Sequence, residues 1–188
     1  MPRGTPEETF GEARAAMERG DWEGAFACLD PADVARIAKN TFARFLMAGG
    51  AAADAFLQIC GSHGISEATI ADIRARGQAI LQAPGPATLE QSRRHQELVK
   101  AYQQAQEDAL DSVADLAAFT GALERAVRAD GSGGSVSSQL FIGERLEGVS
   151  IDGTKAWATR RMASSAAEEV GFVHRKNGWY IRLFARRR

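Results

Sequence analysis

The clearest pair of chemically active residues is a cysteine and a histidine at the spacing Cys60-x-x-His63. This spacing is half of a tetrahedral zinc site, and Cys28, His95 and His174 are the residues left to complete it. A structural zinc site normally carries a second closely spaced ligand pair, and the sequence has none. We therefore predict no bound metal and no cofactor. Both cysteines lie in helix-patterned apolar stretches, where a free thiol behaves as a small buried hydrophobe.

A histidine and a carboxylate on expected strands are the candidates for acid–base chemistry. His174 falls on the face of its strand that we expect to be apolar, and it becomes a possible general base if a pocket opens there. Glu147, which stands among small residues on another strand, is its possible companion. In the simpler interpretation, the ring nitrogens of His174 form hydrogen bonds with backbone groups and the Glu147 carboxylate is exposed to solvent. We predict no catalytic residue; if there is one, it is one of these two.

The last strands carry arginine and aromatic side chains on one face, and these types are enriched at protein–protein contacts. We predict a partner-binding surface made of Arg175, Tyr180, Arg182 and Phe184. An alternative partner is nucleic acid, because arginines can track phosphates and rings can stack on bases. The acidity of the helical half argues against that alternative. The arginines and rings considered for it are Arg160, Arg161, Arg175, Arg182, Arg186, Arg187, Arg188, Trp157, Tyr180 and Phe184.

The elements that hold these residues change type at a break, Asp130-Gly-Ser-Gly-Gly-Ser-Val-Ser-Ser138. Before it, apolar residues recur at helical spacing; after it, four short runs have strand character. The break is glycine-rich, but no Lys-Ser/Thr follows and no helix begins at its end, so it is a linker and not a phosphate loop. The sequence predicts an α+β fold in which an N-terminal helical segment packs on a C-terminal four-stranded antiparallel meander, shaped like a cone.

Capping signals divide the first part into helices. Thr5, Pro6 and Glu8 form a capping box with proline at the first helical position, and Thr88 with Gln91 forms a second box. The helix after Thr88 has a narrow apolar stripe and is expected to be the most exposed. The predicted helices run from Thr5 to Gly20, from Asp21 past Leu29, from Pro31 to Gly49, around Phe56 to Ile59 before a break at Cys60 to Gly64, from Ser66 to Leu81, from Thr88 to Leu110, and from Ser112 through Val127, the last lying across the sheet.

Two dipeptides, Asp152-Gly153 and Asn177-Gly178, are typical of two-residue hairpin turns. As type I′ turns they set Gly148 opposite Trp157, Glu144 opposite Arg161, His174 opposite Ile181 and Phe172 opposite Leu183. The strands are expected at 139–151, 154–162, 169–176 and 179–184.

The chain has 188 residues, 45% of them hydrophobic and 25% charged, which suits an ordinary globular protein. We divide it into a helical region, 1–83, and a region of helices plus sheet, 84–188, which together form one compact unit. The net charge of −1 combines +5 for residues 139–188 with −6 for residues 1–138, so the C-terminal strands can attract an acidic partner. No stretch is apolar enough for a signal peptide or a membrane span, and we expect a cytoplasmic protein without membrane contact.

Residues 111–184 resemble the nuclear-transport-factor-like and cystatin-like families in the order of their elements and in the closing run Gly171-Phe-Val-His-Arg-Lys-Asn-Gly-Trp-Tyr-Ile-Arg-Leu-Phe184. The resemblance implies a sheet curled round a helix, whose hollow is an enzyme pocket in some members and a binding or dimerisation surface in others. The usual Asp/His pair of the enzymes has no counterpart here. A shorter stretch, from Ala15 to Pro31, resembles one tetratricopeptide unit, but one unit does not make an array.

These observations favour a non-catalytic binding or assembly module that contacts a protein partner or a second copy of itself through the sheet face and the helix near 89–110. The alternatives are a small-molecule-binding protein or enzyme that uses the cone interior, and a nucleic-acid binder.

Overall fold

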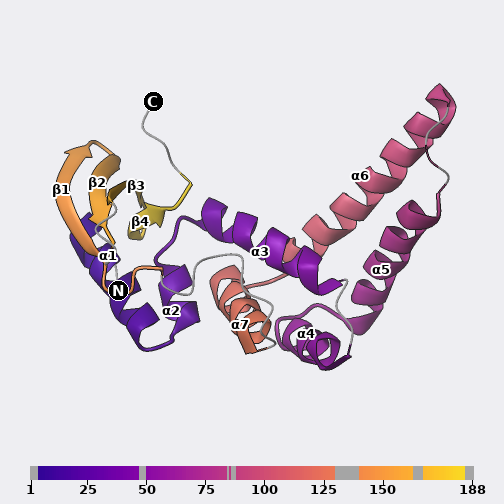
Figure 1. Ribbon diagram of the computed structural model, residues 1–188, viewed down its shortest axis with the longest axis horizontal. Helices are drawn as coiled ribbons and strands as arrows, with labels where there is room; N and C mark the ends of the chain where they lie inside the picture. Colours follow the sequence, from indigo (N-terminus) through magenta and orange to yellow (C-terminus); the bar gives the residue numbers. More distant parts are fainter. Residues whose placement is uncertain are drawn as a thin grey trace.

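The computed structural model describes residues 4–46, 50–83, 85, 88–129, 140–162 and 167–184. Seven helices precede four strands in the described chain, which confirms the α+β class. The sheet and a projecting pair of helices lie at opposite ends of an elongated molecule, with the remaining helices between them (Figure 1). The break at 130–138 and its Gly/Ser run lie outside the described residues.

The helices follow the capping signals closely at their N-termini. Thr5 and Glu8 form the expected capping box, as do Thr88 and Gln91, while Asp21 accepts from the Gly24 amide. The helices are α1 (Pro6–Glu18), α2 (Trp22–Ala27), α3 (Pro31–Leu46), α4 (Gly50–Ser62), α5 (Glu67–Gln82), α6 (Leu89–Asp111) and α7 (Leu116–Ala129).

Two helix boundaries were predicted wrongly. The helix expected to break at Cys60 continues through Gly61 to Ser62, and the chain turns only at Gly64, whose φ is 90°. The last helix starts after Asp115, which accepts from the Ala118 amide, and not after Ser112. Ser112 instead ends α6. Serine and aspartate are both favoured N-cap residues, so the sequence alone does not tell whether Ser112 or Asp115 begins α7.

The four strands form an antiparallel meander in the order β1-β2-β3-β4. They are β1 (Arg145–Asp152), β2 (Lys155–Arg161), β3 (Ala167–Arg175) and β4 (Gly178–Arg182). Their bounds lie within a few residues of those expected, except that β1 begins later, after a turn at residues 140–143.

The predicted strand register is wrong at both hairpins, because the glycines occupy other turn positions. Arg175 pairs with Gly178, whose φ is 114°, so the two turn residues are Lys176 and Asn177. A glycine in the left-handed region after a type I turn makes the common three-residue hairpin loop. His174 therefore faces Trp179, and Phe172 faces Ile181. The shift is by two positions, so each residue keeps its predicted face.

The β1–β2 hairpin differs in a similar way. Asp152 pairs with Lys155, and Gly153, with φ 57°, takes the first central position, as type II′ turns require. This turn places Ser150, and not Gly148, opposite Trp157. A bulge follows between Glu147 and Ser150 and includes Gly148 at φ 62°. Beyond the bulge the shift from the predicted register falls from two positions to one, so Arg161 stands opposite Arg145. The predicted pair of Glu144 with Arg161 is consequently wrong.

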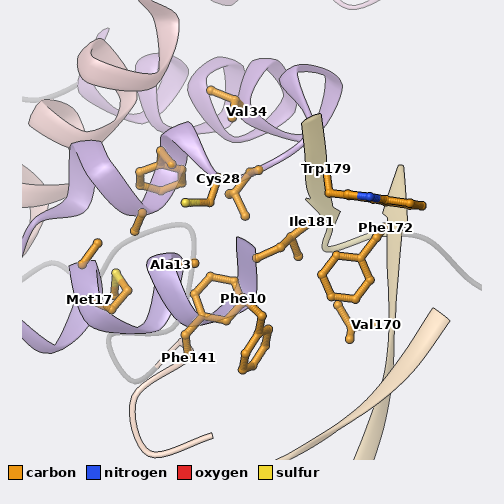
Figure 2. Close-up of a cluster of buried hydrophobic side chains, with 14 of the residues drawn as sticks. Phe10, Ala13, Met17, Cys28, Val34, Phe141, Val170, Phe172, Trp179 and Ile181 are labelled. Carbon is orange, nitrogen blue, oxygen red and sulfur yellow. The ribbon is translucent and has the colours of Figure 1, made fainter. Parts of the chain in front are cut away.

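The sheet packs on α1 and not on α7. Phe10, Ala13 and Met17 of α1 belong to one hydrophobic cluster with Phe172 and Ile181 of the sheet (Figure 2). The expectation that the helix around 113–127 crosses the sheet is wrong: its apolar residues are buried in a second cluster, against α3, α4 and α5. Members of that cluster include Phe42, Phe45, Phe56, Ile65, Ile70, Ile73, Phe119, Leu123 and Val127.

One glycine explains why α7 lies against α2. A Cβ at Gly121 would stand 2.8 Å from the backbone nitrogen of Glu23 and 2.9 Å from its Cα. Only glycine permits this close approach of the two backbones.

The outer edge of β4 is covered by the segment between α2 and α3. Ile181 donates its N–H to the Cys28 carbonyl at 2.9 Å, and Asp30 donates to the Ile181 carbonyl at 2.7 Å. Leu29 and Ile181 form a parallel bridge. This pairing satisfies backbone groups that an edge strand would otherwise expose.

Helices α5 and α6 form an antiparallel hairpin that extends away from the body (Figure 1). Most of α6 is exposed, as predicted, and its buried residues, Gln106, Ala109 and Leu110, all lie near its C-terminal end. Within the described ranges, none of the helices has the length and apolar character needed to cross a membrane.

Candidate interaction surfaces

The four predicted partner-binding residues lie close together at the β3–β4 end of the sheet. Tyr180 and Arg182 alternate along β4 with Trp179 and Ile181, which face the core, so they project from the opposite face of the sheet. Arg175 is the last residue of β3, and Phe184 lies just after the end of β4. We call Arg175, Tyr180, Arg182 and Phe184 the sheet-edge patch.

Two arginines of the patch share one buried carboxylate. The Asp30 oxygens lie 2.7 Å from Nη2 of Arg175 and 3.5 Å from Nε of Arg182. The Asp30 side chain is buried, whereas both arginines remain nearly half exposed. These ion pairs fix the β3–β4 hairpin to the start of α3, and they leave guanidinium N–H groups at the surface.

The start of α3 supplies further contacts that the sequence interpretation missed. Asp33 is buried and accepts the Leu183 N–H at 2.7 Å. Burial raises the pKa of this carboxyl above its ordinary value, although backbone hydrogen bonds oppose the shift. The guanidinium of Arg36 lies 4.3 Å from the centre of the Phe184 ring. Asp30 and Asp33 pair with residues about 150 positions away in the sequence, and such contacts leave no local signal.

Apolar surface adjoins the patch. Tyr180 lines a cleft of about 210 Å³ together with Phe26, Leu29, Val34 and Leu116. On the same face of the sheet, Trp157 is half buried and belongs to neither hydrophobic cluster. The sheet-edge patch therefore combines exposed guanidinium groups with a shallow apolar cleft, the usual composition of a contact surface.

The α5–α6 hairpin presents a second surface. At its tip, Leu81 and Leu89 are each 72% exposed. Two clefts lie between the helices: one of about 620 Å³ near the body, which Asp72, Arg76, Ala101, Ala105 and Asp108 help to line, and one of about 410 Å³ near the tip, which Ala79, Arg94, His95 and Leu98 help to line. We call the two clefts together the hairpin groove. Nδ1 of His95 is buried there without a hydrogen-bond partner among the described residues.

The structure does not bring His174 and Glu147 together. Glu147 of β1 is in register with Thr159 of β2 and, beyond it, Glu169 of β3. Glu169 precedes His174 by five residues, about 17 Å of strand. His174 is exposed at the end of the apolar face, with its ring edge-on to Trp179 at 5.2 Å.

Glu147 is held as a carboxylate. It accepts hydrogen bonds from Nε and Nη2 of Arg161, and this pairing lowers the pKa of Glu147 below its ordinary value. A general acid needs the opposite shift, so the arrangement does not suit that role.

The possible metal ligands are also dispersed. Cys60 is buried in the second cluster, where burial raises its thiol pKa to about 12, and His63 stands edge-on to Phe119. Cys28 lies in the other cluster and His95 on the hairpin. Among the described residues no three His, Cys, Asp or Glu side chains are placed to hold a metal ion.

Among the described residues, the arginines considered for nucleic acid each have a carboxylate nearby. Arg160 contacts Glu144 at 3.4 Å and Glu168 at 2.7 Å, and Arg161 pairs with Glu147. Arg175 and Arg182 share Asp30, while residues 186–188 lie outside the described residues.

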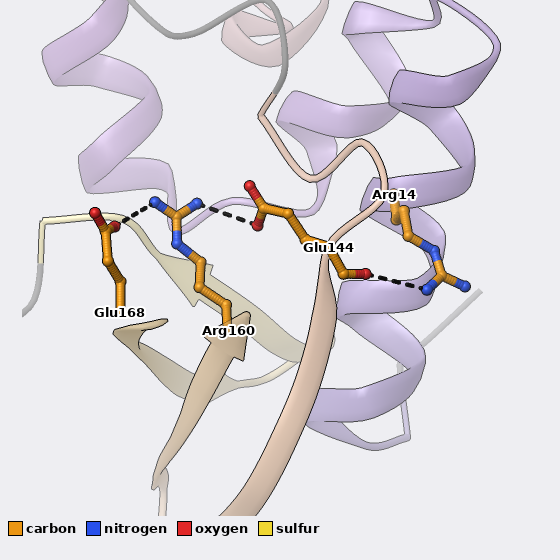
Figure 3. A network of polar contacts seen from close by, with 4 residues as sticks. All are labelled: Arg14, Glu144, Arg160 and Glu168. Carbon is orange, nitrogen blue, oxygen red and sulfur yellow. Dashed lines mark hydrogen bonds and ion pairs between the residues drawn. The ribbon is translucent and has the colours of Figure 1, made fainter. Parts of the chain in front are cut away.

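The Arg160 network contains a buried carboxylate that the sequence interpretation paired with the wrong arginine. Glu144 lies just before β1, its side chain is 6% exposed, and burial raises its pKa although Arg160 opposes the shift. Arg160 lies between Glu144 and Glu168, while Arg14 of α1 donates to the Glu144 carbonyl at 3.3 Å (Figure 3). These contacts fasten one end of the sheet to α1 and are structural.

Comparisons with protein families, with curated proteins and with solved structures found no match for this chain. The resemblance to nuclear-transport-factor-like and cystatin-like proteins therefore stays a prediction.

Proposed function

We propose that the protein is a non-catalytic binding or assembly module that makes protein–protein contacts through its sheet-edge patch and its α5–α6 hairpin. The observation that carries the proposal is the hairpin itself. It extends two helices away from the hydrophobic clusters and exposes Leu81 and Leu89 at its tip. Ordering such a hairpin gains little from burial within the chain, which favours a role in contacting something outside it.

The sheet-edge patch supports the same proposal. Arg175 and Arg182 are anchored by Asp30, so their exposed N–H groups are held in place beside the Tyr180 cleft. Side chains that are already ordered lose less entropy when a partner binds. Because the two arginines share the single Asp30 carboxylate, positive charge remains in the patch and favours an acidic partner segment. We also propose a cytoplasmic location, where the free thiols of Cys28 and Cys60 stay reduced.

The test uses the tagged full-length protein as bait in extracts of its own cells, with quantitative mass spectrometry. We expect at least one protein to be retained by the wild type and lost with Tyr180→Asp or with the pair Leu81→Glu and Leu89→Glu. Ile151→Glu is the matched control, because Ile151 is a 57% exposed apolar residue on β1, away from both surfaces. A wild type that retains nothing and is monomeric at every concentration contradicts the proposal.

The two alternatives gain no specific support from the geometry. The side of the sheet that faces α1 is filled by Phe10, Phe141, Phe172 and Ile181, which leaves little room for a ligand in the expected hollow. The arginines suited to phosphates are engaged by carboxylates.

A further inference from the structure

One side of α6 carries a pattern that runs along the hairpin groove. Arg94, Leu98, Ala101, Ala105 and Asp108 follow one another at intervals of four, three, four and three residues, the spacing that keeps side chains on one helix face. All five line the two clefts of the groove. This face of α6, which we call the strip, therefore borders both clefts and is left partly uncovered by α5.

The pattern is charged at both ends and apolar in the middle. Arg94 and Asp108 are fourteen residues apart, about 21 Å along the helix axis. Ala101 stands midway between them. A second copy of the same strip, laid on the first in the antiparallel direction, would place each Arg94 beside the opposite Asp108. The strip is thus complementary in charge to itself.

Both charges lack an ion-pair partner in the described part of one chain. The C-terminal end of a helix carries partial negative charge, yet Asp108 and Asp111 occupy the last turn of α6, which has no basic residue. In the described part of the chain, the Asp108 carboxylate accepts only from the neutral side-chain amide of Gln104, at 2.8 Å. Across the same residues Arg94 forms no ion pair. A second α6 would supply the missing opposite charge to both.

We propose that the groove partner is a second copy of this chain, and that two hairpins pack antiparallel about a twofold axis at Ala101. This inference rests on the proposed function and names its partner. Leu98 of each copy packs against the partner's Ala101 and the partner's Ala105, since small residues let two helices approach to about 8 Å. Each Arg94 pairs with the partner's Asp108 at the rim. Such a contact repeats identically on both copies, as twofold interfaces do.

The test is a charge exchange followed by sedimentation equilibrium of the full-length protein, from about 1 to about 300 μM, a range that covers weak dimers. Arg94→Glu and Asp108→Arg each place like charges at both ends of the interface, and each should weaken self-association at least about tenfold.

An equimolar mixture of the two variants should dimerise again. In the mixed dimer the acidic side chain introduced at position 94 of one chain meets the basic side chain introduced at position 108 of the other. At the opposite end the native Arg94 and Asp108 meet. The double variant should also recover, because it exchanges the two charges without changing their complementarity.

Matched controls change the same charges beside the groove. Arg93→Glu and Asp111→Arg alter α6 by the same amounts, but neither residue lines the clefts, and both variants should associate like the wild type. Recovery in the mixture also excludes a folding defect as the cause of the single-variant losses.

A wild type that stays monomeric throughout the range, or variants whose mixture does not recover, overturns the inference. Neither result changes what the capture experiment with Tyr180→Asp measures, which is binding to other proteins. Failure of the dimer and failure of the proposed function are therefore distinguishable. A dimer that ignores Arg94→Glu but is lost with Leu81→Glu would likewise overturn the groove arrangement in favour of contact at the hairpin tip.

Discussion

Replacing Arg160, which lies between Glu144 and Glu168, should show how much an unpaired buried carboxylate destabilises the fold. We expect Arg160→Met to lower the free energy of unfolding by about 3 kcal/mol or more, because it leaves Glu144 buried without a cation. The Glu144 side chain is only 6% exposed and that of Arg160 is 15% exposed, so water compensates little. Glu168 is 55% exposed and contributes little to this cost. For a chain of this size the loss corresponds to about 6–12 °C in Tm.

The assay is urea unfolding at about pH 7, followed by far-UV circular dichroism and tryptophan fluorescence. Glu144→Gln is the matched second variant. Alone it should change stability by less than about 1 kcal/mol, since it removes a charge whose burial is itself unfavourable. Combined with Arg160→Met it should recover at least half of the loss. A loss below about 1 kcal/mol for Arg160→Met, or no recovery in the double variant, would refute the reasoning.

Three further outcomes follow from single contacts. Gly121→Ala should destabilise the protein by about 1–3 kcal/mol, because the added Cβ overlaps the α2 backbone. Gly61→Ala is its control: the position is helical with open space around a Cβ, so the change should be neutral or stabilising by up to about 1 kcal/mol. Thermal unfolding of both variants distinguishes the effect of packing from that of helix propensity. Thr41→Val removes a buried hydroxyl that donates to Glu124 at 2.7 Å and should cost about 1.5–3 kcal/mol in urea unfolding. Because burial raises the pKa of Glu144 above its ordinary value of 4.5, the stabilising contribution of this group is present below that pH and declines as the pH rises. The stability of the wild type relative to Glu144→Gln should therefore fall as the pH rises above 4.5 in urea unfolding, and a rise would contradict the sign.

Local signals in the sequence were enough to predict the α+β class and most helix starts. The capping boxes at Thr5 and Thr88 and the change of hydrophobic period after the break depend on neighbours within a few residues, so they can be read without the fold. The faces of β3 and β4 were also predictable, because alternation survives a register shift of two. The exact register was not, since Asn177-Gly178 fits more than one turn type.

The choice of which helix covers the sheet was not available from pattern alone. The stripes of α1 and of α7 are both amphipathic, and periodicity tells which side of a helix is apolar but not what it meets. Gly121 was a usable signal, since a glycine within a helix often marks a close approach. The contacts of Asp30 with Arg175 and Arg182 join distant parts of the chain, and nothing local announces them. The site residues themselves stay predictions.

The pairing of the first helices with the last strand has a consequence for how the protein is made. The apolar side of α1 and the Cys28 carbonyl find their contacts only when β4 has been made. The Thr9 hydroxyl, for example, donates to the Trp179 carbonyl, 170 positions later in the sequence. At about 5–20 residues per second, a ribosome needs on the order of ten to thirty seconds to deliver that strand after the helix has emerged. Throughout that interval the part of α1 that contacts the sheet, including Phe10, lacks its cover. The sheet-facing side of the N-terminal helix is thus a natural target for a chaperone during synthesis, until β4 covers it.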